Sequence, residues 1–214
     1  MAKIDFPALY RLQDKVLSIV FSVETGFYLT GGTCLHRFYR EQRYSDDLDL
    51  FSNDSRLFRD DVRLIRRALD HAALSLDVVV DSRDFVRFFV ADMLKVDLVN
   101  DRVHRVGGSV RTQVNIVLDN IDNIGANKIC ALLGRDDPKD VFDLYTIFRT
   151  PERNWAAILS AAQKKCAFEM EELRFRLESF PLSLVSMLHI TDPGFLSDLK
   201  RDYRLLIDCI LGAE

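Results

Sequence analysis

Apolar residues recur along the chain at the spacings of amphipathic helices and strands. Residues 6–23 carry apolar side chains three and four positions apart, which predicts a helix, and residues 56–73 predict a second. A short helix is also expected at 34–40. The shorter apolar or alternating runs predict strands at 26–29, 47–51, 74–80, 85–90, 93–99 and 114–118.

Beyond residue 120 the pattern is helical throughout. Asp122 is expected to cap the first helix of this part, and Pro138 suits the first turn of the next. The helices are predicted at 122–133, 138–149, 154–165, 168–178 and 194–211. The chain is therefore assigned to the α+β class, with a mixed sheet and flanking helices at 1–120 and a C-terminal helical bundle at 121–214.

The amino-acid composition excludes some classes of protein function. The 214 residues are 48% apolar and 29% charged, which is typical of a globular protein rather than a disordered one. A net charge of -4 argues against a general nucleic-acid coat, and no DNA partner is expected. Local basic clusters are interpreted as solvated faces, with RNA contact as the alternative. They lie at 63–67, 102–111 and 164–165.

The expected compartment is the cytoplasm. No secretory signal pattern is present, and no run approaches the roughly 18 apolar residues that span a bilayer, so no membrane partner is predicted. The four cysteines show no metal-ligand spacing and are interpreted as free thiols, with Cys34 buried. They are Cys34, Cys130, Cys166 and Cys209.

Two short motifs carry the candidate chemistry. Gly31 and Gly32 follow a predicted strand and precede a helix, an order that can aim backbone N–H groups at a phosphate. Asp47 and Asp49 alternate with leucines at period two and therefore share one strand face. With Asp97 of a later strand, they can hold two Mg²⁺ ions, or Mn²⁺ instead. Taken singly, each motif is more often an ordinary turn.

Several longer stretches resemble a known family. Leu29–Leu35, with the letters LTGGTCL, is followed by Arg43–Phe51, with the letters RYSDDLDLF, and Ala126–Leu132 and Lys139–Leu144 follow downstream in matching order. This combination is similar to the AbiEii/AbiGii toxin family of nucleotidyltransferases, within the DNA polymerase beta-like superfamily. The resemblance implies the polymerase beta-like fold, with the helical part completing the active-site cleft.

The resemblance also implies roles for individual residues. Asp47, Asp49 and Asp97 match the catalytic metal ligands. Asp140 and Asp143 match a second acidic pair that the resemblance also makes catalytic, facing the active-site cleft, either to position Lys128 or Arg135 or to act as a base. Surface solvation is the alternative for Arg43, Lys128 and Arg135, and a helix N-terminal acid is the alternative for the acidic pair, mainly for Asp140. The residues implied to bind the NTP are Gly31, Gly32, Thr33, Arg43, Ser45, Lys128 and Arg135.

The function expected from the resemblance is transfer of a nucleoside monophosphate from an NTP to an acceptor hydroxyl, on tRNA or protein. The expected setting is a bacterial type IV toxin-antitoxin or phage-defence system, with a cognate antitoxin as partner. A non-catalytic NTP-binding module and a metal-dependent nuclease are the alternatives. The histidines are given no role, and the phenylalanines, Phe88 and Phe89 among them, are assigned to the core rather than to a base-stacking surface.

Overall fold

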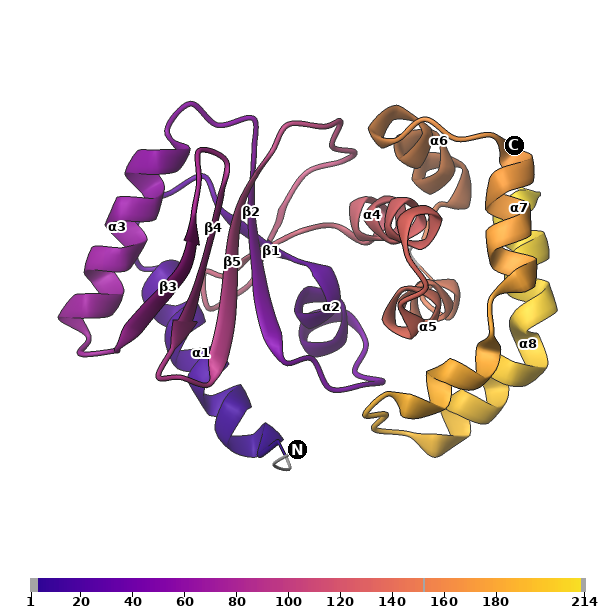
Figure 1. Ribbon diagram of the computed structural model, residues 1–214, viewed down its shortest axis with the longest axis horizontal. Coiled ribbons are helices and arrows are strands. Elements are labelled where there is room, and N and C mark those ends of the chain that lie inside the picture. Colours follow the sequence, from indigo (N-terminus) through magenta and orange to yellow (C-terminus); the bar gives the residue numbers. More distant parts are fainter. Residues whose placement is uncertain (1–3, 152, 213–214) are drawn as a thin grey trace. The chain divides into compact units, whose positions relative to one another are not determined.

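The computed structural model describes residues 4–151 and 153–212, which form two compact units (Figure 1). The first unit comprises residues 4–34, 45–103 and 109–119. The second comprises residues 35–44, 104–108 and 120–212 without residue 152. The segments 35–44 and 104–108 thus belong to the helical unit although the chain on both sides of them belongs to the sheet unit. The division at residue 120 stays a prediction.

The first unit is built on a mixed sheet. Among the described residues the sheet has seven strands in the order β3-β4-β5-β2-β1-β7-β6. Strand β2 pairs in parallel with β5 and β1 in parallel with β7, and the other neighbours are antiparallel. The strands are β1 (Tyr28–Thr30), β2 (Asp47–Asn53), β3 (Leu76–Asp81), β4 (Phe85–Val90), β5 (Leu94–Asp101), β6 (Val110–Arg111) and β7 (Val117–Leu118). The α+β class is confirmed.

One face of this sheet is apolar and closed. Helix α1 (Phe6–Val20) packs against α3 (Phe58–His71) and β5. Alternate strand residues bury their side chains completely because period-two alternation sends them to the same side. These inward residues are Leu48, Leu50, Val86, Phe88, Val90, Val96 and Leu98. Their neighbours in sequence, which include Asp47 and Asp49, therefore lie on the opposite face.

The second unit is helical. Helix α4 packs against α5 and α6, and Gly125 lets α4 approach Ile158 of α6, because a Cβ at that position would lie 3.1 Å from the isoleucine. Its long helices are α4 (Ile121–Gly134), α5 (Pro138–Phe148), α6 (Trp155–Lys165), α7 (Met170–Ser179) and α8 (Pro193–Leu211). A π-helix, η1 (Leu35–Tyr39), continues the short α2 (Gly31–Cys34), and a 3-10 helix, η2 (Leu182–Met187), was not predicted.

One local prediction, the residue that caps α4, is corrected. Asn120, rather than Asp122, caps α4, since its side chain accepts a hydrogen bond from the backbone of Asn123 at 2.9 Å. Asp122 instead lies in the first turn and accepts from the backbone N–H of Asn154 at 3.0 Å. An asparagine at the N-cap serves the helix as well as an aspartate does, so composition alone did not separate the two positions.

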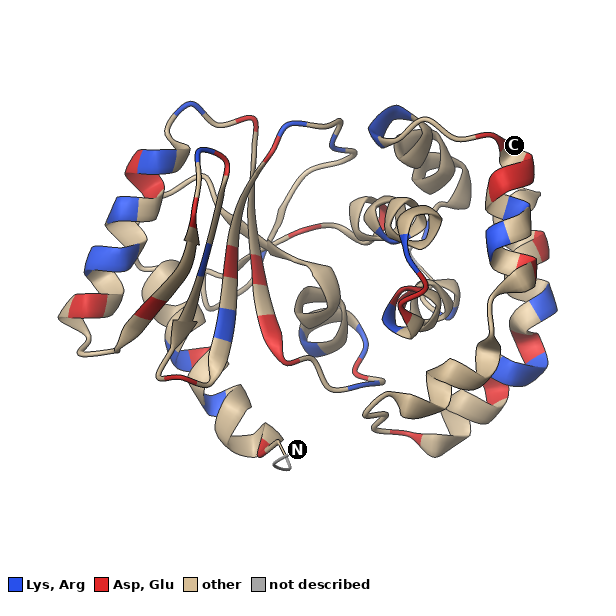
Figure 2. Ribbon diagram, in the orientation of Figure 1, with Lys and Arg blue, Asp and Glu red and all other residues tan. Residues whose placement is uncertain are grey.

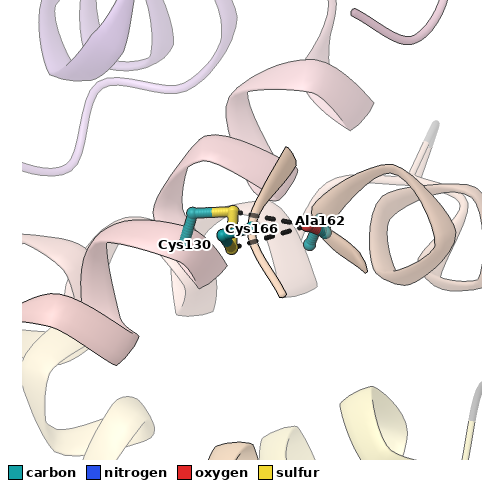
Figure 3. Close-up of a disulfide and its surroundings, with 3 residues drawn as sticks. All are labelled: Cys130, Ala162 and Cys166. Atoms are coloured by element: carbon teal, nitrogen blue, oxygen red, sulfur yellow. Dashed lines mark hydrogen bonds between the residues drawn. A yellow bond between two sulfur atoms is a disulfide. The ribbon is translucent and has the colours of Figure 1, made fainter. Parts of the chain in front are cut away.

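The cysteines divide into a pair and two free thiols. Cys130 of α4 and Cys166, which follows α6, form a disulfide with Cα atoms 6.2 Å apart (Figure 3). Their sulfur atoms lie 3.6 and 3.5 Å from the carbonyl oxygen of Ala162. The prediction of free thiols is wrong for this pair, which the packing of α4 on α6 brings together, and is confirmed for Cys34 and Cys209.

Candidate active site

Three carboxylates share the open face of the sheet. In the parallel ladder of β2 and β5, Asp49 is directly opposite Asp97, and Asp47 is directly opposite Lys95. Directly opposed residues point to the same side of a sheet, so Asp47, Asp49 and Asp97 form a cluster that spans two adjacent strands. Figure 2 shows acidic positions on both strands. The predicted grouping of Asp97 with the Asp-x-Asp pair thus has a structural basis in the strand register.

Two cations hold this cluster. The Nζ atom of Lys95 lies 2.9 Å from Oδ2 of Asp47 and 3.9 Å from Oδ2 of Asp97. Arg87 of β4 donates from Nε and Nη2 to the two carboxylate oxygens of Asp97, each at 2.7 Å. Hydrogen bonding to Asp97 raises the pKa of Arg87. Burial lowers the pKa of Lys95, but the negative charges of Asp47 and Asp97 raise it by more, so the pKa lies above its ordinary value.

Neither cation was predicted as a site residue. Lys95 stands two positions before Asp97 on the same strand, so period-two alternation alone could have placed it on the acidic face. Arg87 could not be found in this way, since its position opposite Asp97 depends on the register between β4 and β5.

Gly31 is placed directly beside the carboxylates. Its φ is +69°, a conformation that favours glycine, and a Cβ added there would collide with Oδ2 of Asp49. Thr33, in the same short helix α2, donates its hydroxyl hydrogen to the backbone carbonyl of Asp47 at 2.5 Å. The glycine turn and the Asp-x-Asp strand are therefore fitted to each other within the first unit.

The other residues of the first unit that were predicted to bind the NTP lie close in sequence to the glycine turn or to the Asp-x-Asp strand, and they are buried. Gly32 is buried in α2, and Ser45 is 2% exposed. Gln13 of α1 donates to the carbonyl of Ser45 at 3.0 Å, and this bond fixes the segment that leads into β2. Cys34 is fully buried, and burial raises the pKa of its thiol well above the ordinary value, which agrees with a structural role.

The donor set suits a magnesium ion, which prefers carboxylate oxygens. Gly31 leaves the space beside Asp49 that any larger residue would fill. In this conformation Lys95 and Arg87 engage two of the three acids, and within 4–151 and 153–212 no three His, Cys, Asp or Glu side chains are grouped as metal ligands. Magnesium binding by Asp47, Asp49 and Asp97 stays a prediction.

A cavity of about 560 Å³ borders the acidic face. Asp47 and Lys95 contribute polar groups to its wall, and Phe89 and Met93 contribute apolar surface. Its other lining residues are Ile4, Asp5, Leu9, Asp46 and Asp92. All of them belong to the first unit, so the cavity is a property of the sheet and α1 alone.

A second charged cluster lies inside the helical unit. Asp143 of α5 is fully buried and accepts hydrogen bonds from Nε and Nη2 of Arg43, both at 2.8 Å. Nε2 of His36 lies 2.7 Å from the same carboxylate, and Nζ of Lys128 lies 2.7 Å from it. Arg43 is only 2% exposed, and its backbone forms an isolated antiparallel β-bridge with Ile190. Surface solvation is therefore the wrong interpretation for Arg43.

Lys128 and Arg135 share the other predicted acid of α5. Asp140 is fully buried, and Lys128 lies 3.0 Å from its Oδ1 while Nε of Arg135 lies 2.7 Å from its Oδ2. The side chain of Lys128 is 12% exposed and that of Arg135 is 57% exposed. Solvation is thus also wrong for Lys128, and Asp140 does more than stabilise a helix N-terminus. The NTP-binding roles of Arg43, Lys128 and Arg135 stay predictions.

The surrounding charges set the protonation of this cluster. Burial would raise the pKa of Asp143, but Arg43, Lys128 and His36 together hold it well below its ordinary value. Burial lowers the pKa of His36 below its ordinary value, although Asp143 opposes this effect. His36 was given no role from the sequence, because it stands 107 positions before its partner.

The structure has the fold of known nucleotidyltransferases. A crystal structure of a putative nucleotidyltransferase from H. pylori superposes with a TM-score of 0.58 at 19% identity, covering 100% of this chain and 99% of that one. MenT4, a nucleotidyltransferase toxin from Mycobacterium tuberculosis, superposes with a TM-score of 0.59 at 12% identity, covering 98% and 88%. No curated protein sequence matches the chain.

The sequence profile of the family described as "Nucleotidyl transferase AbiEii toxin, Type IV TA system" matches residues 18–214. The chain belongs to this AbiEii family of nucleotidyltransferase toxins, as its motifs predicted. None of the helices in the described ranges is long and apolar enough to cross a membrane.

Proposed function

We propose that the protein transfers a nucleoside monophosphate from an NTP to an acceptor hydroxyl in a magnesium-dependent reaction at Asp47, Asp49 and Asp97. The observation that supports this proposal most directly is the register of β2 and β5, which sets the three carboxylates on one sheet face beside Gly31. Family membership supports the transferase class.

The reaction breaks the bond between the α- and β-phosphates, releases pyrophosphate and joins the α-phosphate to the acceptor oxygen, whose proton is lost to solvent. Bound Mg²⁺, or Mn²⁺, would supply the positive charge that activates the attacking oxygen and neutralises the triphosphate. Asp47, Asp49 and Asp97 hold the metal ions in this proposal. Gly31 and its neighbours offer backbone N–H groups to the phosphates, as the absence of a Cβ allows close approach.

The biological setting proposed is a bacterial type IV toxin-antitoxin pair, of which this protein is the toxin, or a phage-defence system. The family description supports a toxin with an antitoxin as its partner. The protein MenT4, which has a similar fold, is itself a nucleotidyltransferase toxin.

The test incubates the purified protein with magnesium, total tRNA and each α-labelled NTP in turn. The variant Asp49→Asn keeps the shape of the side chain but removes its charge, and it should lose transfer while its melting temperature is retained. Asp70→Asn, an exposed acid of α3, is the matched control and should transfer label as the native chain does. Chelation of the metal with EDTA should abolish transfer. Equal activity of Asp49→Asn and the native chain would exclude this site.

A non-catalytic NTP-binding module is the second candidate. It is favoured by one observation, the neutralisation of Asp47 and Asp97 by Lys95 and Arg87. In that case NTP should raise the melting temperature, as any ligand of the native state does, while no pyrophosphate forms.

A further inference from the structure

A second cavity, of about 420 Å³, lies at the opposite end of the sheet strands from the carboxylates. It is bounded by the loop between β2 and α3, the turn between β3 and β4, and the end of β5, all of which belong to the first unit. Asn53, the last residue of β2, stands four positions after Asp49, which is about 13 Å along the strand. This cavity is therefore separate from the site proposed for transfer.

Arginines dominate the charge of the cavity wall. Four guanidinium groups and two carboxylates line it, an excess of two positive charges in a chain whose net charge is -4. Figure 2 shows basic positions in the loop before α3 and in the turn between β3 and β4. The charged residues of the wall are Arg56, Arg59, Arg83, Arg102, Asp54 and Asp84. A local excess of positive charge on an acidic protein attracts anions.

One buried side chain fixes the three segments that form the wall. Asn100 of β5 is 5% exposed, and its side chain accepts a hydrogen bond from the backbone N–H of Ser55 at 2.8 Å. The same side chain donates to the carbonyl of Ser55 at 3.1 Å and to Oδ1 of Asp84 at 2.9 Å. The loop before α3 and the turn after β3 are thus held to the end of β5 without any ligand.

Both carboxylates of the wall are paired with a single arginine. Arg102 donates from Nη1 to Oδ1 of Asp54 and from Nη2 to Oδ1 of Asp84, each at 2.7 Å. Because one guanidinium satisfies both acids, little negative charge is left for the other arginines of the wall.

Two of the other arginines are not neutralised in this way. Arg59 is held by the carbonyl of Ser82 at 2.7 Å and by Asp81 at 2.6 Å. Arg83, in contrast, is 87% exposed, and its Nε lies 3.9 Å from Asp84, which Arg102 already engages. Arg56 is exposed and forms no ion pair or hydrogen bond with any residue of 4–151 and 153–212. Arg56 and Arg83 therefore offer guanidinium groups from two different segments.

The shape and size of the cavity indicate which anion it suits. A guanidinium presents a planar fork of N–H donors that matches the oxygens of a phosphate group. The volume of about 420 Å³ falls within the range of about 300–1,000 Å³ that is usual for small-molecule sites. The aromatic residue of the wall, Phe58, is only 2% exposed, so its ring is not open to a nucleobase. Recognition therefore falls on phosphate groups.

We propose that this cavity is a second anion site, which binds a diphosphate group through Arg56 and Arg83, with Arg102 and Arg59 as fixed positive charges behind them. The diphosphate is either inorganic pyrophosphate or part of a nucleoside diphosphate. Since the arginines neutralise the anion, the site needs no metal ion. The proposal does not depend on the transfer reaction at Asp49.

Isothermal titration calorimetry with pyrophosphate, in the presence of EDTA, tests the site without metal-dependent binding at the carboxylates. The double variant Arg56→Gln/Arg83→Gln should bind pyrophosphate about 10- to 100-fold more weakly, because it loses two charged hydrogen-bond donors. Its melting temperature without ligand should be retained, since both side chains are exposed. Arg63→Gln is the matched control, as Arg63 is a 63% exposed arginine of α3 outside the cavity wall, and it should bind as the native chain does.

Three results would overturn the site. They are the absence of pyrophosphate binding by the native chain, equal binding by the double variant, and equal binding of sulfate at the same ionic strength. Asp49→Asn should keep its affinity for pyrophosphate, and a loss there would place the anion at the carboxylates instead. Titration with ADP and GDP identifies the source: tighter binding than pyrophosphate supports a nucleoside diphosphate as the ligand, and equal or weaker binding supports the inorganic anion.

Discussion

Gly31 and Asp49 are fitted to each other so closely that a single methyl group at Gly31 would collide with the Asp49 carboxylate. The turn that follows β1 and the strand that carries the acids are therefore one structural unit. This relationship explains why a glycine is needed there in terms of space as well as of backbone conformation.

The substitution Gly31→Ala should lower the free energy of unfolding by about 1–3 kcal/mol and abolish nucleotidyl transfer, since it strains the backbone at a positive φ and displaces Asp49. Gly134→Ala is the control, because no atom lies within 4 Å of a Cβ at that position. Urea denaturation and the labelled-NTP assay measure both effects. An alanine variant with native stability and activity would contradict the close fit.

The buried pair of Arg43 and Asp143 should be a major determinant of stability in the helical unit. Replacement of Asp143 by alanine removes the carboxylate with which the buried side chains of Arg43 and Lys128 are paired. The free energy of unfolding should therefore fall by about 3–5 kcal/mol. In contrast, Arg63→Ala breaks an exposed pair with Asp60 and should cost at most about 1 kcal/mol. Similar losses in the two variants, measured by urea denaturation, would refute this difference.

Stability should decline on mild acidification because of His36. Its pKa in the folded state lies below the ordinary value of 6.5, so the unfolded chain takes up the proton first. The contribution of His36 to the free energy of unfolding should therefore be fully present above pH 6.5. It should be lost progressively as the pH drops toward the folded-state pKa. The depressed pKa of Asp143 adds a loss in the same direction only below its ordinary value of 3.8.

Denaturation with urea at a series of pH values tests this expectation. His36→Gln retains a hydrogen-bond donor near Asp143 but does not titrate, so the slope between pH 7 and the folded-state pKa should flatten. His71→Gln, at an exposed position at the end of α3, should keep the native slope. An unchanged slope in His36→Gln would assign the pH dependence to another group.

The disulfide between Cys130 and Cys166 should stabilise the helical unit by restricting the unfolded chain across a separation of 36 residues. Cys130→Ser, or reduction of the native chain, should therefore lower the free energy of unfolding by about 2–4 kcal/mol. Cys209→Ser, at a free cysteine, should leave it unchanged under non-reducing conditions. If reductant has no effect on the melting temperature of the native chain, the bond is not formed in solution.

Local sequence patterns were sufficient to predict many helices and strands of this protein and the acidic strand face. The alternation of acids and leucines over residues 47–51 placed Asp47 and Asp49 on one face, because side chains on a strand repeat every two residues. Helix caps and prolines located α5 and α8 to within one residue at their starts or ends. The family motifs then indicated the fold and the transferase class, which the structural comparisons and the family profile confirm.

Other features depended on contacts between distant segments. Strand register placed Arg87 opposite Asp97 and turned Phe89 outward, and no single strand's sequence specifies which neighbour it meets. The partners of Asp143 stand 100 and 107 positions away at Arg43 and His36. Their burial, unlike an amphipathic face, leaves no periodic signal in the sequence.

What the sequence by itself determined is thus the order of the long helices and the longer strands, the face that bears Asp47 and Asp49, and the family. Only the tertiary structure decided which charges are paired, which cysteines are joined and which aromatic rings stay exposed. The physical reason is that hydrophobic periodicity is set by local backbone geometry, whereas ion pairs and disulfides require approach in space, which depends on how the whole chain packs.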